Sequence, residues 1–174
     1  SIVASGSNDA NVQLMVIAIN GLLGVYGNTI DATKAVNLRK GDDAAFASFV
    51  KGLNSGAVSG VIFYNCNPVY DHALGADIAT GLGKAKFTLS TSDRNDETTA
   101  LVKYVAPDNH FLESWNDFEP VTGYFSLSQP AIKNIFDTRQ AQQSFLTWSG
   151  DTTSYYDYVR ANWEANVFSK ANTI

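Results

Sequence analysis

The sequence predicts an α/β fold with a mostly parallel sheet. Apolar runs of strand length at residues 58–64 and 86–90 alternate with segments of helical periodicity, which is the pattern of βαβ units. The first run ends in Asn-Cys-Asn-Pro at residues 65–68, where proline cannot continue a sheet ladder. We therefore expect a buried strand that delivers polar side chains to the carboxyl edge of the sheet, where open α/β sheets bind ligands. The expected architecture has three layers and is Rossmann-like.

The composition agrees with one globular domain of this class. The 174 residues are 45% hydrophobic and 17% charged, which suits a folded core rather than a disordered chain. The net charge of -5 argues against nucleic acid as the main partner. Cys66 is the single cysteine, so the chain can form no internal disulfide and cannot hold an iron–sulfur cluster of the usual kind. The only methionine is Met15, and we expect a domain excised from a longer protein.

The N-terminal segment should begin with the end of a strand at residues 2–4 and a tight turn at residues 5–7. Ser7, Asn8 or Asp9 can cap a helix whose apolar residues recur at helical spacing as far as Leu22. Glycines at positions 24 and 27 should end this helix, because glycine readily adopts a left-handed terminus. Residues 28–40 are polar and should form a loop with a short extended piece.

The middle of the chain should supply the rest of the core. A second helix is expected over residues 42–54, with one apolar face formed by Phe46, Phe49, Val50 and Leu53. Residues 75–84 should form a further helix, weakened near its end by two glycines. After the strand at 86–90, a turn at 92–96 should lead into a helix over residues 97–104 and a short strand at 105–107.

The last third of the chain has a different character. Residues 108–138 are rich in aromatic, Asn, Asp and Gly residues without helical period, so we expect an irregular segment, extended near 124–129. Two helices should follow, one at 139–148 and one capped by Thr153 or Ser154. We thus predict one domain over residues 1–174, with a core at 1–107, the irregular segment at 108–138 and C-terminal helices at 139–170. The concentration of aromatic residues here would suit a docking surface if part of it faces outward.

Three turns are candidates for a ligand site. The first, at Gly6, Ser7 and Asn8, opens a helix and could expose backbone N–H groups to a phosphate. It lacks the glycine spacing of a dinucleotide fingerprint or a P-loop, and an ordinary turn is the better interpretation. The second holds Asn65, Asn67 and Pro68; its amides could bind a ligand or satisfy backbone groups within the turn. Cys66 beside them is expected to be a buried structural thiol.

The third candidate turn consists of Asp96, Glu97 and Thr98 at an expected helix start, where acidic residues are favoured by capping. His110, Glu113 and Asp117 form a separate polar cluster, but no nucleophile accompanies them. Neither a GxSxG elbow nor an HExxH motif occurs, and the two histidines make a structural metal improbable. The residues alone therefore predict no catalytic set and no metal site.

Several segments resemble the molybdopterin oxidoreductase superfamily, in its cofactor-domain region. They are residues 21–28 (GLLGVYGN), 61–68 (VIFYNCNP) and 96–107 (DETTALVKYVAP). A narrower match is closer. The chain looks like the large molybdopterin oxidoreductase-like iron–sulfur binding subunit of bacterial alternative complex III at residues 67–70 (NPVY), 110–117 (HFLESWND), 126–130 (SLSQP), 136–139 (FDTR) and 155–163 (YYDYVRANW).

This resemblance implies a domain of the molybdopterin oxidoreductase cofactor-domain type in a membrane-bound, quinol-oxidising respiratory complex. It places the subunit on the periplasmic side of the bacterial inner membrane, in contact with other domains and subunits. It implies a scaffold without its own cofactor, with 4Fe-4S clusters elsewhere in the subunit. The three turns would then be vestiges of a pterin nucleotide site. The alternative is half of a molybdopterin guanine dinucleotide site in an active molybdenum or tungsten enzyme. Whether the domain is itself part of an enzyme stays open at this point.

Overall fold

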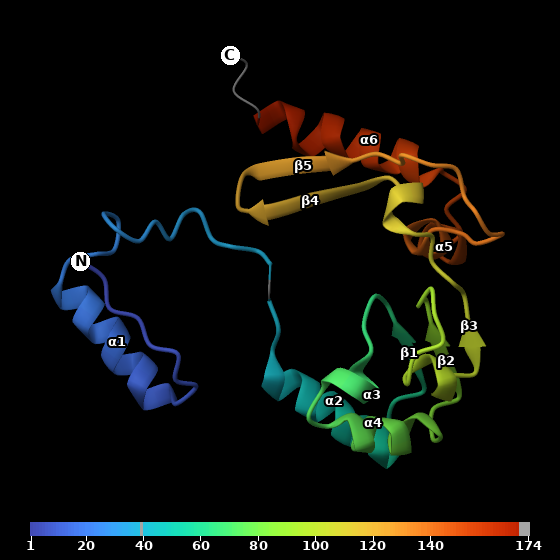
Figure 1. The fold of residues 1–174 in the computed structure, drawn as a ribbon, viewed down its shortest axis with the longest axis horizontal. Coiled ribbons are helices and arrows are strands. Elements are labelled where there is room, and N and C mark those ends of the chain that lie inside the picture. Colours follow the sequence, from blue (N-terminus) through green and yellow to red (C-terminus); the bar gives the residue numbers. More distant parts are fainter. Residues whose placement is uncertain (39, 171–174) are drawn as a thin grey trace. The chain divides into compact units, whose positions relative to one another are not determined.

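The computed structural model describes residues 1–38 and 40–170, and for Lys170 the backbone only. The chain forms two compact units (Figure 1). The first unit comprises residues 1–40 and 118–126, and the second comprises residues 41–117 and 127–174. The single domain over residues 1–174 stays a prediction.

Helix α1 (Ala10–Leu22) is the main element of the first unit. Asp9 caps it, as one of the predicted residues, with Oδ1 accepting from the N–H groups of Asn11 at 2.7 Å and Val12 at 3.3 Å. The chain leaves the helix through Gly24, whose φ of 62° is the left-handed conformation that glycine was expected to supply. The helical prediction is confirmed here.

The strand expected at residues 2–4 is wrong. Instead of a neighbouring strand, the buried side chain of Asn20 pairs with Val3: its Oδ1 accepts from the Val3 N–H at 2.9 Å, and its Nδ2 donates to the Val3 carbonyl at 2.8 Å. An amide side chain offers the same donor and acceptor as one backbone unit. It therefore satisfies this extended segment without a sheet.

A hairpin was missed inside the segment expected to be irregular. Strands β4 (Asn116–Val121) and β5 (Tyr124–Ser128) form a two-stranded sheet, joined at Gly123 with a φ of 84°. The extended stretch expected near 124–129 is confirmed as β5. Proline is tolerated only at sheet edges, so the sequence did not predict a strand around Pro120. In the first unit, its carbonyl accepts from the Asn37 N–H at 2.9 Å.

The second unit is a mixed α/β structure built on a three-stranded parallel sheet, as predicted at this coarse level. Strands β1 (Gly60–Phe63), β2 (Phe87–Ser90) and β3 (Tyr104–Val105) lie in the order β1-β2-β3. The register pairs Gly60 with Phe87 and Leu89 with Tyr104. The strand expected at 58–64 is shorter and is not fully buried, because Phe63 points into the core while Ile62 is 44% exposed. Alternate side chains of a strand point to opposite faces, and on β1 the packed helices cover the face that carries Phe63.

Helices α2 (Asp43–Ser55) and α4 (Gly75–Leu82) supply that cover, and α3 (Pro68–Asp71) lies between them in sequence. The predicted apolar face of α2 is confirmed: Val50 and Leu53 enter the core, with Phe46 and Phe49 packed against it. The remaining core residues are Phe63, Ile78, Leu82 and Ala85. Burying such side chains contributes on the order of 1.5–3 kcal/mol each, so this layer holds the sheet in place.

The helix expected over residues 97–104 is wrong. Only a short 3-10 turn, η1 (Thr99–Leu101), forms there. The Lys103 N–H donates to Thr88 Oγ1 at 2.8 Å, and the next residue enters β3 beside β2. Pairing with a strand therefore overrides the local helical preference. Further along lie η2 (Phe111–Glu113), α5 (Ala141–Trp148), α6 (Tyr155–Asn166) and η3 (Phe168–Lys170), and Ser154 caps α6 as predicted.

Candidate functional site at the carboxyl edge of the sheet

The loops that leave the three parallel strands meet at one edge of the second unit. The Thr91 N–H donates to the Phe63 carbonyl at 3.0 Å, and the Asp108 N–H donates to the Thr91 carbonyl at 3.0 Å. These bonds tie the loop after β2 to the ends of β1 and β3. Polar side chains from all three loops are thereby gathered where α/β sheets carry their sites.

The second and third candidate turns are brought together here. Asn67 Oδ1 accepts from the Thr98 N–H at 3.1 Å and from Thr98 Oγ1 at 2.7 Å, while Asn67 Nδ2 donates to Glu97 Oε2 at 2.7 Å. Thr98 Oγ1 in turn accepts from the Val69 N–H at 3.1 Å. Pro68, the first residue of α3, is buried. The pair Asn67–Thr98 thus joins the start of α3 to the start of η1.

Asn65 and Cys66 lie on the outer side of the same turn. Asn65 has a φ of 51°, a left-handed conformation that asparagine tolerates better than most residues. The reversal leaves Cys66 exposed, so the expectation of a buried thiol is wrong. Partial burial of the side chain still raises the pKa of the Cys66 thiol, as do the charges of Asp71 and Asp96. A thiol whose pKa is raised is poorly ionised and is not an activated nucleophile.

Asp96 performs the capping role that its position predicted. Its Oδ1 accepts from the Thr99 N–H at 2.7 Å. Partial burial acts to raise the pKa of this carboxyl, but hydrogen bonds from Thr99, Ser92 and Thr98 together outweigh it and lower the pKa. Asp96 is therefore ionised at neutral pH and holds the first turn of η1 through charge-assisted bonds.

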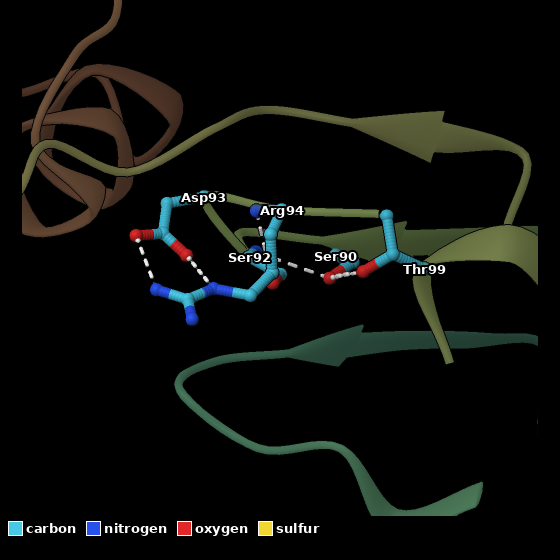
Figure 2. Close-up of polar contacts among 5 residues, drawn as sticks. All are labelled: Ser90, Ser92, Asp93, Arg94 and Thr99. Carbon is cyan, nitrogen blue, oxygen red and sulfur yellow. Dashed lines mark hydrogen bonds and ion pairs between the residues drawn. The ribbon is translucent and has the colours of Figure 1, made fainter. Parts of the chain in front are cut away.

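A polar cluster at the end of β2 was not singled out from the sequence (Figure 2). Ser90 Oγ lies 2.8 Å from Thr99 Oγ1, both buried, and accepts from the Ser92 N–H at 3.1 Å. Arg94 binds Asp93 with two nitrogens, at 2.7 and 3.0 Å, and its hydrogen bond is the largest cause that lowers the pKa of Asp93. The Arg94 side chain is 76% exposed, so the pair adds little stability but presents a cation at the edge. The sequence signal for Arg94 was its position shortly after the end of a predicted strand.

Asp108 lies at the end of the third strand loop. Its Oδ1 accepts from the N–H groups of Asn109 and Ala141, each at 2.8 Å, and so ties this loop to the start of α5. Burial is the main cause that raises the pKa of Asp108, against the opposing effect of these bonds. Burial also raises the pKa of Tyr64, with a further contribution from Asp108, and the Tyr64 hydroxyl accepts from Gln142 Nε2.

The first candidate turn belongs to the first unit. The Ser7 N–H donates to Ser5 Oγ at 3.2 Å, and Ser7 Oγ accepts from the Asp9 N–H at 3.1 Å. Two donors that an anion would need are thus already bonded to side chains of the same turn. Gly6 and Asn8 stay candidates by position alone.

The polar cluster of His110, Glu113 and Asp117 has structural partners. Glu113 Oε2 accepts from the His110 N–H at 2.9 Å, and His110 Nδ1 accepts from the Leu112 N–H at 3.3 Å, which together form a capping box around η2. Asp117 Oδ2 accepts from Trp163 Nε1 at 2.8 Å. These bonds stabilise turns and assemble no acid–base pair.

Within residues 1–38 and 40–170, no group of three or more His, Cys, Asp and Glu side chains could hold a metal ion. In the same part of the chain, no helix has both the length and the apolar character needed to cross a bilayer.

Neither a protein-family model nor a curated protein matches the sequence. The candidate site is thus a polar sheet edge at which hydrogen bonds between the turns hold them in place, with Arg94 as an exposed cation.

Proposed function

We propose that this chain is a scaffold and docking domain of a molybdopterin oxidoreductase-like iron–sulfur subunit, of the kind found in bacterial alternative complex III. In this role it takes the cofactor-domain fold type, Rossmann-like, without holding a cofactor of its own. The subunit would lie on the periplasmic side of the inner membrane, in a quinol-oxidising electron-transfer complex with its 4Fe-4S clusters elsewhere. The resemblance of the quoted segments supports this assignment.

One observation carries the scaffold interpretation. The polar groups of the second and third turns are used by each other, since Asn67 takes up both donors of Thr98 and also binds Glu97. Thr98 is 0% exposed. A nucleotide site needs donors that point outward to the ligand, and freeing these would leave buried groups unsatisfied. The network therefore favours a structural role for the two turns.

Exposed aromatic residues in the last third of the chain support the docking part of the proposal. Phe111, Phe136 and Tyr158 are 66%, 74% and 49% exposed. An interface with another protein would cover side chains of this kind, since aromatic residues are enriched in such interfaces. Other domains of the subunit and other subunits of the complex are the partners that this role requires.

Ligand retention tests the proposal. The purified chain is titrated with GDP and with isolated molybdopterin guanine dinucleotide, followed by native mass spectrometry and tryptophan fluorescence, and is analysed for molybdenum, tungsten and iron. We expect no stoichiometric complex and no stoichiometric metal. A one-to-one complex with the dinucleotide that Arg94→Gln weakens at least tenfold, while Lys133→Gln does not, would instead support the half-site. Within the assembled complex, Asn67→Ala should lower thermal stability and leave electron transfer per complex unchanged.

A further inference from the structure

A small apolar pocket lies in the second unit. It has a volume of about 160 Å³. Its lining comes mostly from α6 and η3, with one residue next to β4 and one from β5: Trp115, Leu127, Tyr156, Val159, Arg160, Trp163 and Phe168. All of these residues belong to the second unit.

The walls of the pocket are aromatic and held in place by their neighbours. The rings of Trp115 and Tyr156 lie 4.8 Å apart, and those of Trp163 and Phe168 meet edge to face at 5.8 Å. The indole N–H of Trp163 is already bonded to Asp117 Oδ2 at 2.8 Å. The indole therefore offers the pocket its apolar surface rather than a free donor.

The volume of the pocket suits an occupant of about one ring. An apolar cavity of roughly 150 Å³ in another protein binds benzene, and the pocket here has a similar volume. A larger ligand, such as a nucleotide or a drug-sized molecule, needs a pocket of about 300 Å³ or more. Aromatic walls favour an aromatic occupant, since ring pairs in tilted or edge-to-face contact gain energy beyond area burial.

Arg160 decides the charge of the occupant. Among the lining residues that the structure describes, Arg160 is the one that carries a charge. Its Nε donates to Glu164 at 3.1 Å, one helical turn further along α6. A guanidinium has five N–H donors in a planar fork, so this bond leaves donors for a second carboxylate. A cationic ligand would find no acidic partner among the described residues of the lining.

We propose that this pocket binds a small aromatic carboxylate, with its ring between the aromatic walls and its carboxylate on Arg160. The site is independent of the scaffold role proposed above and uses none of the residues at the carboxyl edge. Its ligand is a monocyclic acid with a short linker, because the pocket holds about one ring and Arg160 lies in the same lining.

Fluorescence tests the site directly, because Trp115 and Trp163 line it. In a Trp148→Phe chain, these two residues are the only tryptophans left. The probe is 3-phenylpropionate, compared with phenethylamine, which carries the opposite charge on a similar ring, and with acetate, which has no ring. We expect saturable quenching by 3-phenylpropionate, about tenfold weaker binding of phenethylamine, and no saturation by acetate.

Variants separate the two parts of the recognition. Arg160→Gln should reduce the preference for acid over amine to nearly one, whereas Lys133→Gln, another exposed cation of the second unit, should leave it unchanged. Leu127→Phe fills the pocket from its rim and should abolish binding of both ring compounds, and far-ultraviolet circular dichroism checks that it folds. The proposal is overturned if 3-phenylpropionate gives no saturable quenching, if the amine binds as well as the acid, or if Arg160→Gln keeps the preference.

Discussion

Replacing Asn67 with alanine tests whether the carboxyl-edge turns hold the second unit together. The side chain makes bonds of 2.7–3.1 Å to Thr98 and Glu97, and it connects two turns that are 31 residues apart in sequence. Alanine removes all of these bonds at once. The N–H and the hydroxyl of Thr98 then lose their acceptor at a position that is 0% exposed.

The expected cost follows from those two donors. A buried donor left without a partner costs about 1–3 kcal/mol. Asn67 itself is partly exposed, so water can reach the vacated space, and the lower half of that range applies. The bond to Glu97 is exposed and adds only about 0.5 kcal/mol. Two donors at about 1–2 kcal/mol each, together with the bond to Glu97, should therefore lower the free energy of unfolding by about 2.5–4.5 kcal/mol, which for a chain of this size lowers the Tm by roughly 5–18 °C.

Urea denaturation followed by tryptophan fluorescence is the suitable assay, because Trp115, Trp148 and Trp163 all lie in the second unit. Glu97→Gln, which keeps a neutral acceptor at the exposed bond, should change stability by less than about 0.5 kcal/mol. In a double-mutant cycle, Asn67→Ala and Thr98→Val should be non-additive by about 1 kcal/mol or more, because they remove a shared bond. An Asn67→Ala change below about 0.5 kcal/mol, or an additive cycle, would refute the structural role of the turn.

Three further predictions concern packing and ionisation. Gly81→Ala should destabilise the fold by about 1–3 kcal/mol in urea denaturation, because its Cβ would lie 2.8 Å from Leu53 Cγ; Gly83→Ala, with its nearest contact at 3.7 Å, should be neutral or slightly stabilising. Burial raises the pKa of Tyr155 to about 12, so its contribution to stability is full below pH 10.0 and is lost as the pH rises towards 12; a 295 nm titration compared with Tyr155→Phe should show this late ionisation, and a normal midpoint would contradict it. Burial also raises the pKa of Asp108 above 3.8, so its stabilising contribution is full below that pH and is lost as the pH rises through the raised value; Asp108→Asn should flatten the pH dependence of the free energy of unfolding above pH 3.8, and an unchanged slope would disprove it.

Most of the helices could be predicted because their determinants are local. Asp9, Asp42 and Ser154 each accept from an N–H within three residues, and each begins a helix where the sequence indicated. The apolar face of α2 follows from residues three and four apart on one helix, which is also a local property. These features could be predicted without knowledge of the fold.

The strands depended on partners that the sequence does not reveal. Residues 2–4 have strand composition, but Asn20 occupies the backbone groups of Val3. β4 forms despite Pro120, because it pairs as part of a hairpin. Residues 97–104 have helical composition, but β3 pairs with β2 and takes the end of that segment. In each case, a contact distant in sequence decided between two conformations of similar local energy.

The candidate site, too, could be predicted only in part. The sequence indicated that polar side chains would follow β1, and parallel strands explain why Asn67 and Thr98 meet at one edge. It did not reveal that Asn67 Oδ1 would accept hydrogen bonds from Thr98, nor that Arg94 would form an exposed ion pair with Asp93. The prediction for Cys66 failed: the backbone takes a left-handed conformation at Asn65, and Cys66, the next residue, is exposed.

The sequence by itself determined the α/β class, the caps and apolar faces of the main helices, and the place where a polar edge would form. These depend on bonds and periodicities within a few residues, which are the same in any fold that contains the segment. Only the tertiary structure decided which strands pair, which polar groups of the edge satisfy each other, and that an aromatic pocket forms around Arg160. Such contacts join residues far apart in sequence, and their energies exist only once the chain has brought both partners together.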